Sequence, residues 1–472
     1  MSYLPTVVYP HEPKSGVDLY LPQRYMRKWS LTPSTICVQF GSSIVHARVS
    51  GSERTSQTLV SRNLAQSLHL PVGMPLFARY QPSQQTLVFG PYLGILVSGY
   101  NAKNSFSPFG PTTSFFNEVA DIYRKRGGVI SVFRPQDVDW EARTVRGLIR
   151  RAGAWRKTVL SLPQCVYNRV VSRQWERSEA MTTWVQRCKD ASIPFFNENF
   201  LNKWHVHSAL EKQESAIPYL PRMVSYQGEE QLQEMFSHFH TVYFKPANGS
   251  MGRGIVRLRR TQSGYQAVSP GGVNKHFSNL AGLHRYLHKL RHGKSYLLQQ
   301  GLRLIGVNGR PTDFRVLVQK NNTGQWAVTS MIARLGQNRI VSNVSRGGSM
   351  VSALRALHIC GPWHGGARPT PQKLKNVALK LADLLEKALP GHYAELGVDL
   401  GVDVNGRIWL LEVNSKPSKT TSARPLPEGV EEPPKRARPS VLRMYDYVSH
   451  LCGFPRKSKS NSKRSGKKSG RR

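Results

Sequence analysis

The 472-residue sequence predicts an α+β protein, divided at this length into roughly two to four packed units. Three observations support this class. The first hundred residues contain short alternating strands, residues 111–200 change to a pattern of helix, glycine and strand, and the later segments 242–258 and 394–414 have the pattern of polar hairpins. The 39% hydrophobic content is compatible with sizeable cores.

Residues 1–105 are predicted to form a small β-rich module. Residues 35–40 alternate between apolar and polar side chains, and residues 43–49 follow a Gly-Ser-Ser turn. Residues 87–97 form an apolar run punctuated by glycine and proline. Several short strands at this spacing are typical of an independent β unit.

Residues 106–198 are predicted to form an α/β domain. Residues 113–126 have the pattern of a helix with a Ser/Thr start, and Gly127 and Gly128 end it. Residues 129–133 then form an apolar run that indicates a buried strand. Helix, glycines and strand in this order favour an α/β layer.

The segment 394–414 carries the strongest local signal. Two apolar runs flank Asn405-Gly406, which is typical of a two-residue hairpin loop. With that loop, Asp399 would lie directly opposite Glu412, and Asn414 would share their face. The other face would form a core from Leu400, Val402, Trp409, Leu411 and Val413.

Two directly opposed carboxylates destabilise a hairpin unless a positive charge lies between them. Oxygen ligands on a rigid sheet suit Mg²⁺, so Asp399, Glu412 and Asn414 are candidate metal ligands. The alternative is an ordinary hairpin whose polar face meets solvent. Asp403 would lie on the same face of the strand as Asp399, but it is next to the turn, where we expect it to be solvated.

A second segment with candidate binding residues, 242–258, has the pattern of strand, glycine-rich loop and strand. Gly249, Gly252 and Gly254 would let the backbone approach phosphate oxygens closely. Their spacing, G-x-x-G-x-G followed by a strand, disfavours a Rossmann or Walker site. Lys245, at the end of the first strand, could reach the same phosphates. The alternative is a flexible turn without a ligand.

These two segments, in this order, resemble the ATP-grasp superfamily over residues 199–425. The resemblance implies two α+β subdomains that close on ATP, at about 199–298 and 299–425, followed by a closing helix within 199–452. It implies that the three carboxylate and amide side chains bind Mg²⁺ through ATP. The loop residues that it places on the phosphates are Gly249, Ser250, Gly252 and Gly254.

Other landmarks of the family fall in the same order. Lys203 resembles the lysine at the entry to the central domain, and residues 295–302 resemble the linking strand that meets adenine. The resemblance therefore implies nucleotide contacts from Lys203, Lys245, Gln299, Gln300 and Leu302. Many relatives have acidic residues where this chain has Gln299 and Gln300. Residues beside the transferred phosphoryl group would be Arg315, Asn343 and Arg346.

A narrower match includes residues 89–96, 165–173 and 196–203, which resemble the YheC/YheD family of proteins associated with the endospore coat. It implies a spore-forming bacterium and a ligase with unknown carboxylate and amine substrates. Phosphoryl transfer needs alignment and charge neutralisation, so no Ser/His/Asp or Cys/His signature is required. The alternative is a structural or anchoring protein of a spore layer.

Charge and cysteine content restrict the setting. Five scattered cysteines without a CxxC pair favour a reducing compartment and disfavour structural zinc, and the 15 histidines show no tight ligand spacing. With no signal peptide or membrane-spanning run, we expect a soluble cytoplasmic protein, associated with the spore coat if the resemblance holds. The net charge of +39 predicts an anionic partner for a disordered tail at 453–472, either nucleic acid, another anionic polymer or a coat component. The alternative is a solubilising or adhesive tail with no defined target.

Overall fold

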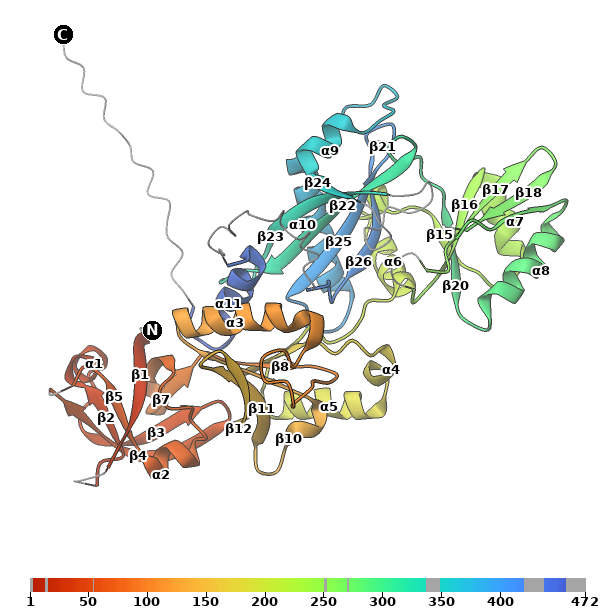
Figure 1. The fold of residues 1–472 in the computed structure, drawn as a ribbon. Coiled ribbons are helices and arrows are strands. Elements are labelled where there is room, and N and C mark those ends of the chain that lie inside the picture. The colour runs from red at the N-terminus through yellow and green to blue at the C-terminus, as the bar shows by residue number, and fades with distance from the viewer. Residues whose placement is uncertain are drawn as a thin grey trace, which may run out of the picture.

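The computed structural model describes residues 3–12, 16–53, 55–249, 253–269, 271–336, 349–419 and 437–455. The described strands form a closed barrel and three open sheets, which follow one another along the chain (Figure 1). The barrel and the second sheet lie at one end of the molecule. The other two sheets form the two subdomains at the opposite end (Figure 1).

The barrel contains the first seven strands in the order β1-β5-β2-β4-β3-β7-β6. Their bounds are β1 Tyr3–His11, β2 Leu19–Pro22, β3 Ser34–Phe40, β4 Ser43–Ser52, β5 Thr58–Ser61, β6 Pro75–Gln81 and β7 Thr86–Gly90. The helices are α1 Gln23–Trp29, α2 Arg62–Ser67 and the 3-10 helix η1 Pro82–Gln84. Alternate strand residues such as Val38, Phe40 and Val60 fill the interior without solvent exposure. The predicted β-rich character of this segment is therefore confirmed.

The barrel repeats one pattern, which the sequence analysis missed. In both β2–α1–β3 and β5–α2–β6, a short strand leads into a short helix and then into a longer strand. Ser30 and His69 follow these helices, and both adopt a left-handed backbone with φ of 50°. Matching backbone hydrogen bonds, Leu31 N–H to Met26 O and Leu70 N–H to Ala65 O, reverse the chain at the two places.

The second sheet has the order β10-β11-β9-β8-β13-β14, with β12 paired to β11. The strands are β8 Tyr92–Leu96, β9 Val129–Phe133, β10 Val138–Asp139, β11 Thr144–Arg151, β12 Ala154–Ser161, β13 Cys165–Asn168 and β14 Phe195–Phe196. The helices are α3 Thr113–Arg126, α4 Arg173–Glu176, α5 Glu179–Asp190, η2 Gly110–Thr112 and η3 Pro135–Asp137.

The predicted helix 113–126 and the predicted strand 129–133 are both present with those bounds. Gly127, with φ of 93°, ends the helix. The apolar run 87–97 is divided at Pro91, because β7 closes the barrel and β8 opens the second sheet. The second sheet with its helices is called the pre-grasp domain below.

The smaller subdomain is a six-stranded sheet in the order β15-β20-β16-β17-β18-β19. Its elements are β15 Met223–Ser225, β16 Thr241–Pro246, β17 Val256–Thr261, β18 Gly264–Val268, β19 Asn274–Phe277, β20 Tyr296–Gln300, α7 Glu229–His238 and α8 Leu280–Arg291. Alternate residues such as Val242, Phe244 and Leu258 pack with Leu232 and Leu283 of the two helices. Tyr243 and Lys245 lie on the opposite face of the sheet, which borders the cleft between the two subdomains.

The larger subdomain has the order β24-β23-β22-β25-β26, with β21 paired to β22. Its elements are β21 Gly306–Val307, β22 Arg310–Lys320, β23 Trp326–Leu335, β24 Ser349–Ser352, β25 Glu395–Val402, β26 Ile408–Asn414, α9 Ala353–Ile359 and α10 Pro371–Ala388. Helix α6, Lys203–Glu211, packs on α10 in this core, although its sequence position had placed it in the smaller subdomain. The 3-10 helix η4 is Ile217–Tyr219.

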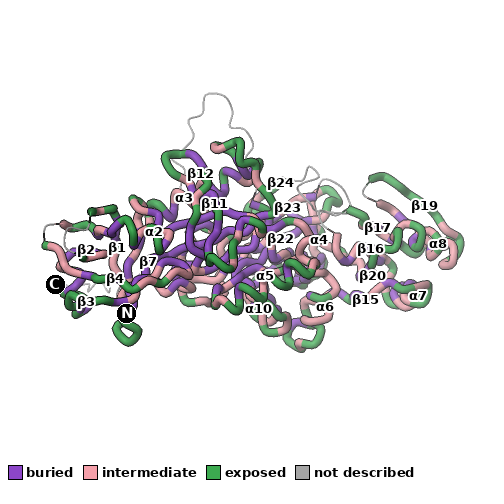
Figure 2. Tube along the Cα trace, turned by 90° about the horizontal axis from the view of Figure 1, so that it is seen from below, coloured by how far each residue is buried: buried purple, intermediate pink, exposed green. Residues whose placement is uncertain are grey.

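The last described helix, α11 at Pro439–Leu451, returns to the pre-grasp domain. Its buried Tyr445 meets Tyr123 of α3 edge to face at 4.9 Å and donates a hydrogen bond to the Gly127 carbonyl at 2.8 Å. Buried residues of α3, α11 and the second sheet form one hydrophobic cluster, and Figure 2 shows the middle of the molecule largely buried. The grasp subdomains and the pre-grasp domain therefore share a packed junction.

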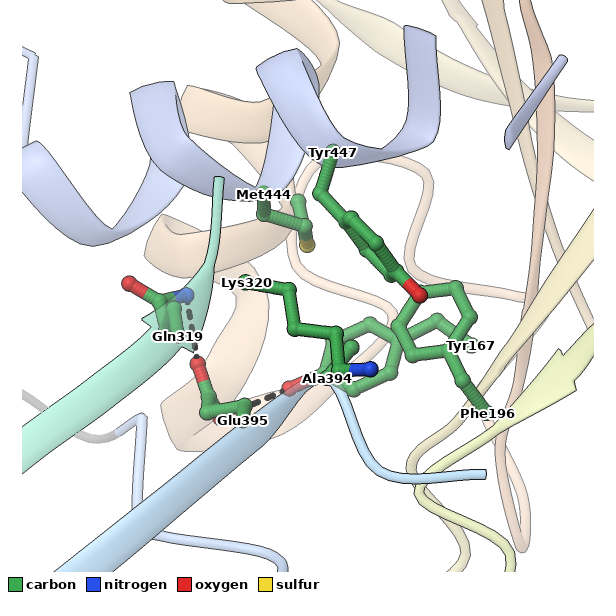
Figure 3. A pocket seen from close by; sticks show the side chains of 8 residues that line it. All are labelled: Tyr167, Phe196, Gln319, Lys320, Ala394, Glu395, Met444 and Tyr447. Atoms are coloured by element: carbon green, nitrogen blue, oxygen red, sulfur yellow. Dashed lines mark hydrogen bonds between the residues drawn. The ribbon is translucent and has the colours of Figure 1, made fainter. Parts of the chain in front are cut away.

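A buried polar network lies at this junction. The Glu395 carboxylate accepts hydrogen bonds from Tyr167 Oη and Gln319 Nε2, both at 2.9 Å, and from Lys419 Nζ at 2.5 Å. Figure 3 shows Glu395 and Gln319 beside Met444 and Tyr447 of α11. The cavity among them measures only about 10 Å³, at the lower limit for one water molecule. The network therefore joins the domains and offers no room for a ligand.

None of the helices in the described residues is long and apolar enough to cross a membrane. Apart from residues 453–455, the predicted basic tail lies outside the described residues. All five cysteines are free thiols, and Cys165 and Cys452 face each other across the junction at 3.8 Å between sulfurs.

Candidate functional site

A cleft of about 1290 Å³ lies between the two grasp subdomains. The smaller subdomain contributes Tyr243 and Lys245, the linker contributes residues 299–304, and the larger subdomain contributes residues of β22, β25 and β26. This volume exceeds that of a typical small-molecule pocket. The two hairpins that the sequence singled out therefore face one cavity from opposite sides.

The hairpin of β25 and β26 brings Asp399 opposite Glu412, as predicted. The route differs from the prediction, because three residues, 404–406, and not two, separate Asp403 from its hydrogen-bonded partner Arg407. From the loop to the pair Leu400 and Leu410, the strands are therefore paired one residue away from the predicted register. A bulge between Asp399 and Leu400 leaves Leu411 without a partner and restores the predicted register from Asp399 outward. Two irregularities thus compensate for each other.

Between turn and bulge, the displaced register changes which side chains face the core. Ile408, Leu410 and Val413 are the core residues of β26, whereas Leu411 lines the cleft beside Glu412. The prediction that Trp409 and Leu411 belong to the core face is therefore wrong. The bulge lets two consecutive residues, Leu411 and Glu412, both border the cavity.

Asp403 is not solvated, contrary to the prediction. It is 9% exposed, and its carboxylate accepts hydrogen bonds from the backbone N–H groups of Asn405 and Arg407, both at 2.9 Å, and from Trp409 Nε1 at 2.8 Å. The carboxylate therefore caps the turn. The guanidinium of Arg407 covers the Trp409 ring at 3.7 Å from the centroid.

Two arginines hold Asp399 from neighbouring strands. Arg315 of β22 binds both carboxylate oxygens, with Nη2 at 2.6 Å from Oδ2, and Arg334 of β23 donates to Oδ2 at 2.8 Å. Arg334 also donates to Asp313 Oδ1 at 2.5 Å. Burial raises the pKa of Asp399, but the two arginines outweigh it and hold that pKa below its ordinary value. Asp399 is therefore an anion in the folded protein.

The metal-binding prediction can be tested against these contacts. A carboxylate accepts about four hydrogen bonds, and the two arginines use three of those positions on Asp399, which leaves one for a cation. Glu412 is half-buried next to it, and Asn414 also lines the cleft. No three His, Cys, Asp or Glu side chains converge as metal ligands among the described residues. The donor set fits Mg²⁺ that obtains its remaining ligands from phosphates and water.

Lys245 lies on the opposite wall, at the end of β16. It is 6% exposed and donates a hydrogen bond to Gln299 Oε1 of the neighbouring strand β20. Burial and the nearby charge of Lys203 lower its pKa to about 7, despite the opposing effect of Glu412. A buried ammonium with one neutral partner is suited to an incoming phosphate.

Lys203 connects the two walls. It is the first residue of α6, and Asn202 caps that helix by accepting the backbone N–H groups of Trp204 and His205 at 2.8 and 3.3 Å. Its Nζ donates to the Gly249 carbonyl at 2.6 Å and lies 3.3 Å from Glu412 Oε1. Lys203 is therefore placed between the glycine-rich loop and the proposed metal ligand.

The glycine-rich loop joins two antiparallel strands, as predicted. A Cβ atom at Gly249 would lie 2.4 Å from Pro246 Cγ, so only glycine fits there without a shift of the loop. Gly254 has a φ of +73°, which also favours glycine. The predicted residues Ser250, Gly252, Asn343 and Arg346 lie outside the described residues.

The linker and two apolar residues complete the cavity. Gln299, Gln300 and Leu302 all line it, and Gln300 Oε1 accepts the backbone N–H of Arg222 at 3.2 Å. Ile255 of the small subdomain and Leu411 of the large one also line it. They add to the apolar surface that Leu302, Leu304 and Val307 also give the cleft.

Several site residues were missed from the sequence. Asp313 and Arg334 line the cleft and were not singled out, because the pairing of β22 with β23 and of β22 with β25 is needed to bring Arg334 to Asp313 and Asp399. The signal that could have indicated them is a charged side chain within a largely apolar strand, Asp313 in β22 and Arg334 in β23. Six cationic side chains line the cleft beyond Lys203, Lys245 and Arg315, namely Arg257, Arg259, Arg303, Arg310, Arg334 and Lys416.

Residues 192–451 match the family model described as YheC/D like ATP-grasp. The chain is 32% identical over 421 residues to endospore coat-associated protein YheD of Bacillus subtilis (strain 168), which covers 87% of this chain and 90% of that protein. It is 25% identical over 317 residues to endospore coat-associated protein YheC of the same organism, covering 64% and 84%.

Solved structures are more distant. D-alanyl-alanine synthetase A from Vibrio cholerae is 11% identical, with a TM-score of 0.46 over 77% of this chain and 98% of that one. A D-cycloserine synthetase is 12% identical, with a TM-score of 0.43 over 77% and 99%. The family match confirms the predicted α+β ATP-grasp fold. This chain belongs to the YheC/YheD family of ATP-grasp proteins.

Proposed function

We propose that this protein is a Mg²⁺·ATP-dependent ligase that joins a carboxylate to an amine. The observation that carries the proposal is the cleft in which Lys203, Lys245 and Arg315 surround the face of Asp399, Glu412 and Asn414. With Mg²⁺·ATP bound, transfer of the γ-phosphoryl group to a substrate carboxylate would form an acyl phosphate and ADP. Attack by an amine would then form the C–N bond and release inorganic phosphate.

The residues of the chain would perform distinct tasks. Asp399, Glu412 and Asn414 would hold Mg²⁺, and Lys203, Lys245 and Arg315 would neutralise phosphate charge. Arg315 and Arg334 keep Asp399 ionised and fix its orientation, because they bind it from two adjacent strands.

The base and the phosphates would occupy different parts of the cleft. Ile255 and Leu411 offer apolar surface from the two subdomains, which suits the flat faces of a purine. The glycine-rich loop would cover the phosphates from the small subdomain. Arg346 and Asn343 remain proposed contacts of the transferred group, on the family resemblance alone.

We propose further that the protein is associated with the spore coat. This rests on the names of the two Bacillus subtilis relatives, both endospore coat-associated proteins. The same observation favours a second candidate, a non-catalytic anchoring protein whose basic tail binds an anionic polymer or coat component. Deletion of residues 456–472 should abolish polyanion binding if the tail is the anchor, and unchanged localisation would exclude that role.

Calorimetric titration with Mg²⁺ and ATP tests the enzyme. We expect the parent protein to bind nucleotide and Glu412→Ala to bind it more weakly, because one proposed metal ligand is lost. ADP release against pooled amino acids and peptides then tests turnover. Absence of nucleotide binding by the parent would reject the ligase and favour the anchoring protein.

A further inference from the structure

The cleft has two ends, and the proposed metal and phosphate residues occupy only one of them. Arg315 of β22 lies beside Asp399 at that end. Arg310, the first residue of β22, also lines the cleft. At about 3.3 Å per strand residue, the Cα atoms of the two arginines are roughly 17 Å apart. The end near Arg310 is called the linker end below, because Thr312 of β22 donates its backbone N–H to Ile305, directly after the linker, at 2.9 Å.

Three arginines line the cleft at its linker end. Arg259 of β17 pairs with Thr241 of β16, whose carbonyl accepts the backbone N–H of Gly301 in the linker at 2.9 Å. Arg303 belongs to the linker itself, and Arg310 begins β22 after the short strand β21. All three residues are exposed. The small subdomain, the linker and the large subdomain therefore each contribute one guanidinium group to this end.

The positive charge at the linker end has no carboxylate counterpart among the described residues. Of these residues, nine lysines and arginines line the cleft against three carboxylates. All three carboxylates are bound by other cations of the cleft, in the pairs Lys203–Glu412, Arg315–Asp399, Arg334–Asp399 and Arg334–Asp313. A triphosphate at the metal end would lie away from the three arginines. They would therefore stay available to a second anionic ligand.

The linker end also offers room and apolar surface. The cleft volume of about 1290 Å³ exceeds the range of about 300–1,000 Å³ for small-molecule pockets, so a nucleotide would not fill it. Ile359 and Pro362 line this end next to Gly361, which pairs with Gly306 of β21. Ile359 is 45% exposed. Apolar surface beside arginines suits a chain with both apolar and acidic groups, such as a peptide, better than a bare polyphosphate.

We propose that the linker end of the cleft binds an acidic peptide segment of a protein partner. Its carboxylates would pair with Arg259, Arg303 and Arg310, since planar guanidinium groups bind carboxylates through two parallel hydrogen bonds. Its apolar groups would contact Ile359. In the proposed ligase this peptide is the substrate, and only that role rests on the proposed function. The binding itself requires no nucleotide.

Hexa-L-glutamate and hexa-L-glutamine test the site, because they have the same length and shape and differ in charge. In calorimetric titrations of the full-length protein without nucleotide, we expect hexa-L-glutamate to bind at least about tenfold more tightly. The preference should shrink as salt is added, since ions screen exposed charges. The basic tail attracts any anion, so variants are needed to assign the preference to the cleft.

Arg259→Gln and Arg310→Gln each remove one positive charge, from the small and the large subdomain respectively. Each should weaken hexa-L-glutamate binding by roughly three- to tenfold, as expected for a charged hydrogen bond that is partly exposed. Arg260→Gln is the matched control, because Arg260 is exposed on the opposite face of β17 and does not line the cleft. All three variants change the net charge equally, so the contribution of the tail is the same. Thermal midpoints check that each variant is folded.

Equal binding of the two peptides by the parent overturns the proposal, and so does an equal effect of Arg259→Gln and Arg260→Gln. Inorganic polyphosphate and a DNA hexanucleotide are tested in the same way. If either loses more affinity than hexa-L-glutamate in Arg259→Gln and Arg310→Gln, the assignment to a peptide is overturned.

Titrations with Mg²⁺ and ATP separate this site from the nucleotide site. Loss of nucleotide binding in Arg259→Gln or Arg310→Gln would place these arginines in the nucleotide site and overturn the proposal. A parent that prefers hexa-L-glutamate but binds no nucleotide would keep the peptide site and remove the ligase. A parent that binds nucleotide without this preference would lose only the peptide site.

Discussion

The Lys203 ammonium group lies 3.3 Å from the Glu412 carboxylate, although the two residues are 209 positions apart in the sequence. The same ammonium group binds the Gly249 carbonyl at 2.6 Å. One side chain on α6 therefore connects the phosphate-covering loop to the proposed metal ligand. We expect its removal to affect nucleotide binding more than stability.

Lys203→Met should weaken Mg²⁺·ATP binding by roughly 10- to 100-fold, since a hydrogen bond to a charged group contributes about 1.5–3 kcal/mol. Calorimetric titration measures this change. Lys212→Met, at an exposed position just after the same helix, is the matched control and should bind as the parent does. Equal affinities for the two variants would contradict the bridging role.

Lys245 should take up a proton when nucleotide binds. Its pKa in the folded protein is about 7, so at pH 8 most of the protein carries it uncharged. A bound phosphate favours the charged form and raises this pKa, which gives an uptake of about one proton per nucleotide at pH 8. Titrations in buffers with different ionisation enthalpies measure it.

Lys245→Arg keeps a positive charge at this position, and the arginine stays protonated both before and after nucleotide binding. This variant should bind nucleotide without the uptake. An uptake that persists in Lys245→Arg would assign the proton to another group.

Arg334→Gln should be strongly destabilising. Loss of one partner from a buried charge network costs roughly 3–5 kcal/mol, and here it leaves Asp313 and Asp399 with less compensation. Chemical denaturation at pH 7 measures this difference from the parent.

The pH dependence of that difference has a defined sign. In the parent, the pKa of Asp399 lies below the ordinary 3.8, so its contribution to stability is present above 3.8 and is lost as the pH falls through the lower folded value. In Arg334→Gln the pKa of Asp399 in the folded protein rises, so the buried carboxylate is neutralised by protonation at a higher pH than in the parent. The stability difference should narrow as the pH falls from 7 toward 4, and a constant difference would argue against Asp399 as the affected group.

Gly249→Ala should impair nucleotide binding through the loop backbone. The added Cβ would meet Pro246 at 2.4 Å, so the loop must shift, at a cost of roughly 1–3 kcal/mol, and the carbonyl bound by Lys203 moves with it. Gly99→Ala is the control, since a Cβ there has no neighbour within 4 Å. The thermal midpoint and the ATP affinity are both measured, and parent-like affinity in Gly249→Ala would reject this role of the loop.

Local sequence patterns were sufficient to predict elements such as the helix 113–126 and the strand 129–133, and the pairing of Asp399 with Glu412. That pairing was correctly predicted although the loop was not, because the additional loop residue and the bulge cancel. The positions of Trp409 and Leu411 were wrong for the same reason, since side-chain parity depends on the local register. Arg334 could not be placed, because its contact with Asp399 spans two strand pairings that no local pattern encodes.

The return of α11 to the pre-grasp domain has a consequence for synthesis of the chain. Val441, Met444 and Tyr445 cover apolar residues of α3, such as Phe115 and Val119. During translation, α3 emerges from the ribosome long before its cover, so its apolar face stays exposed while both grasp subdomains are made. The nascent pre-grasp domain therefore keeps an uncovered apolar face until residues 439–451 have emerged.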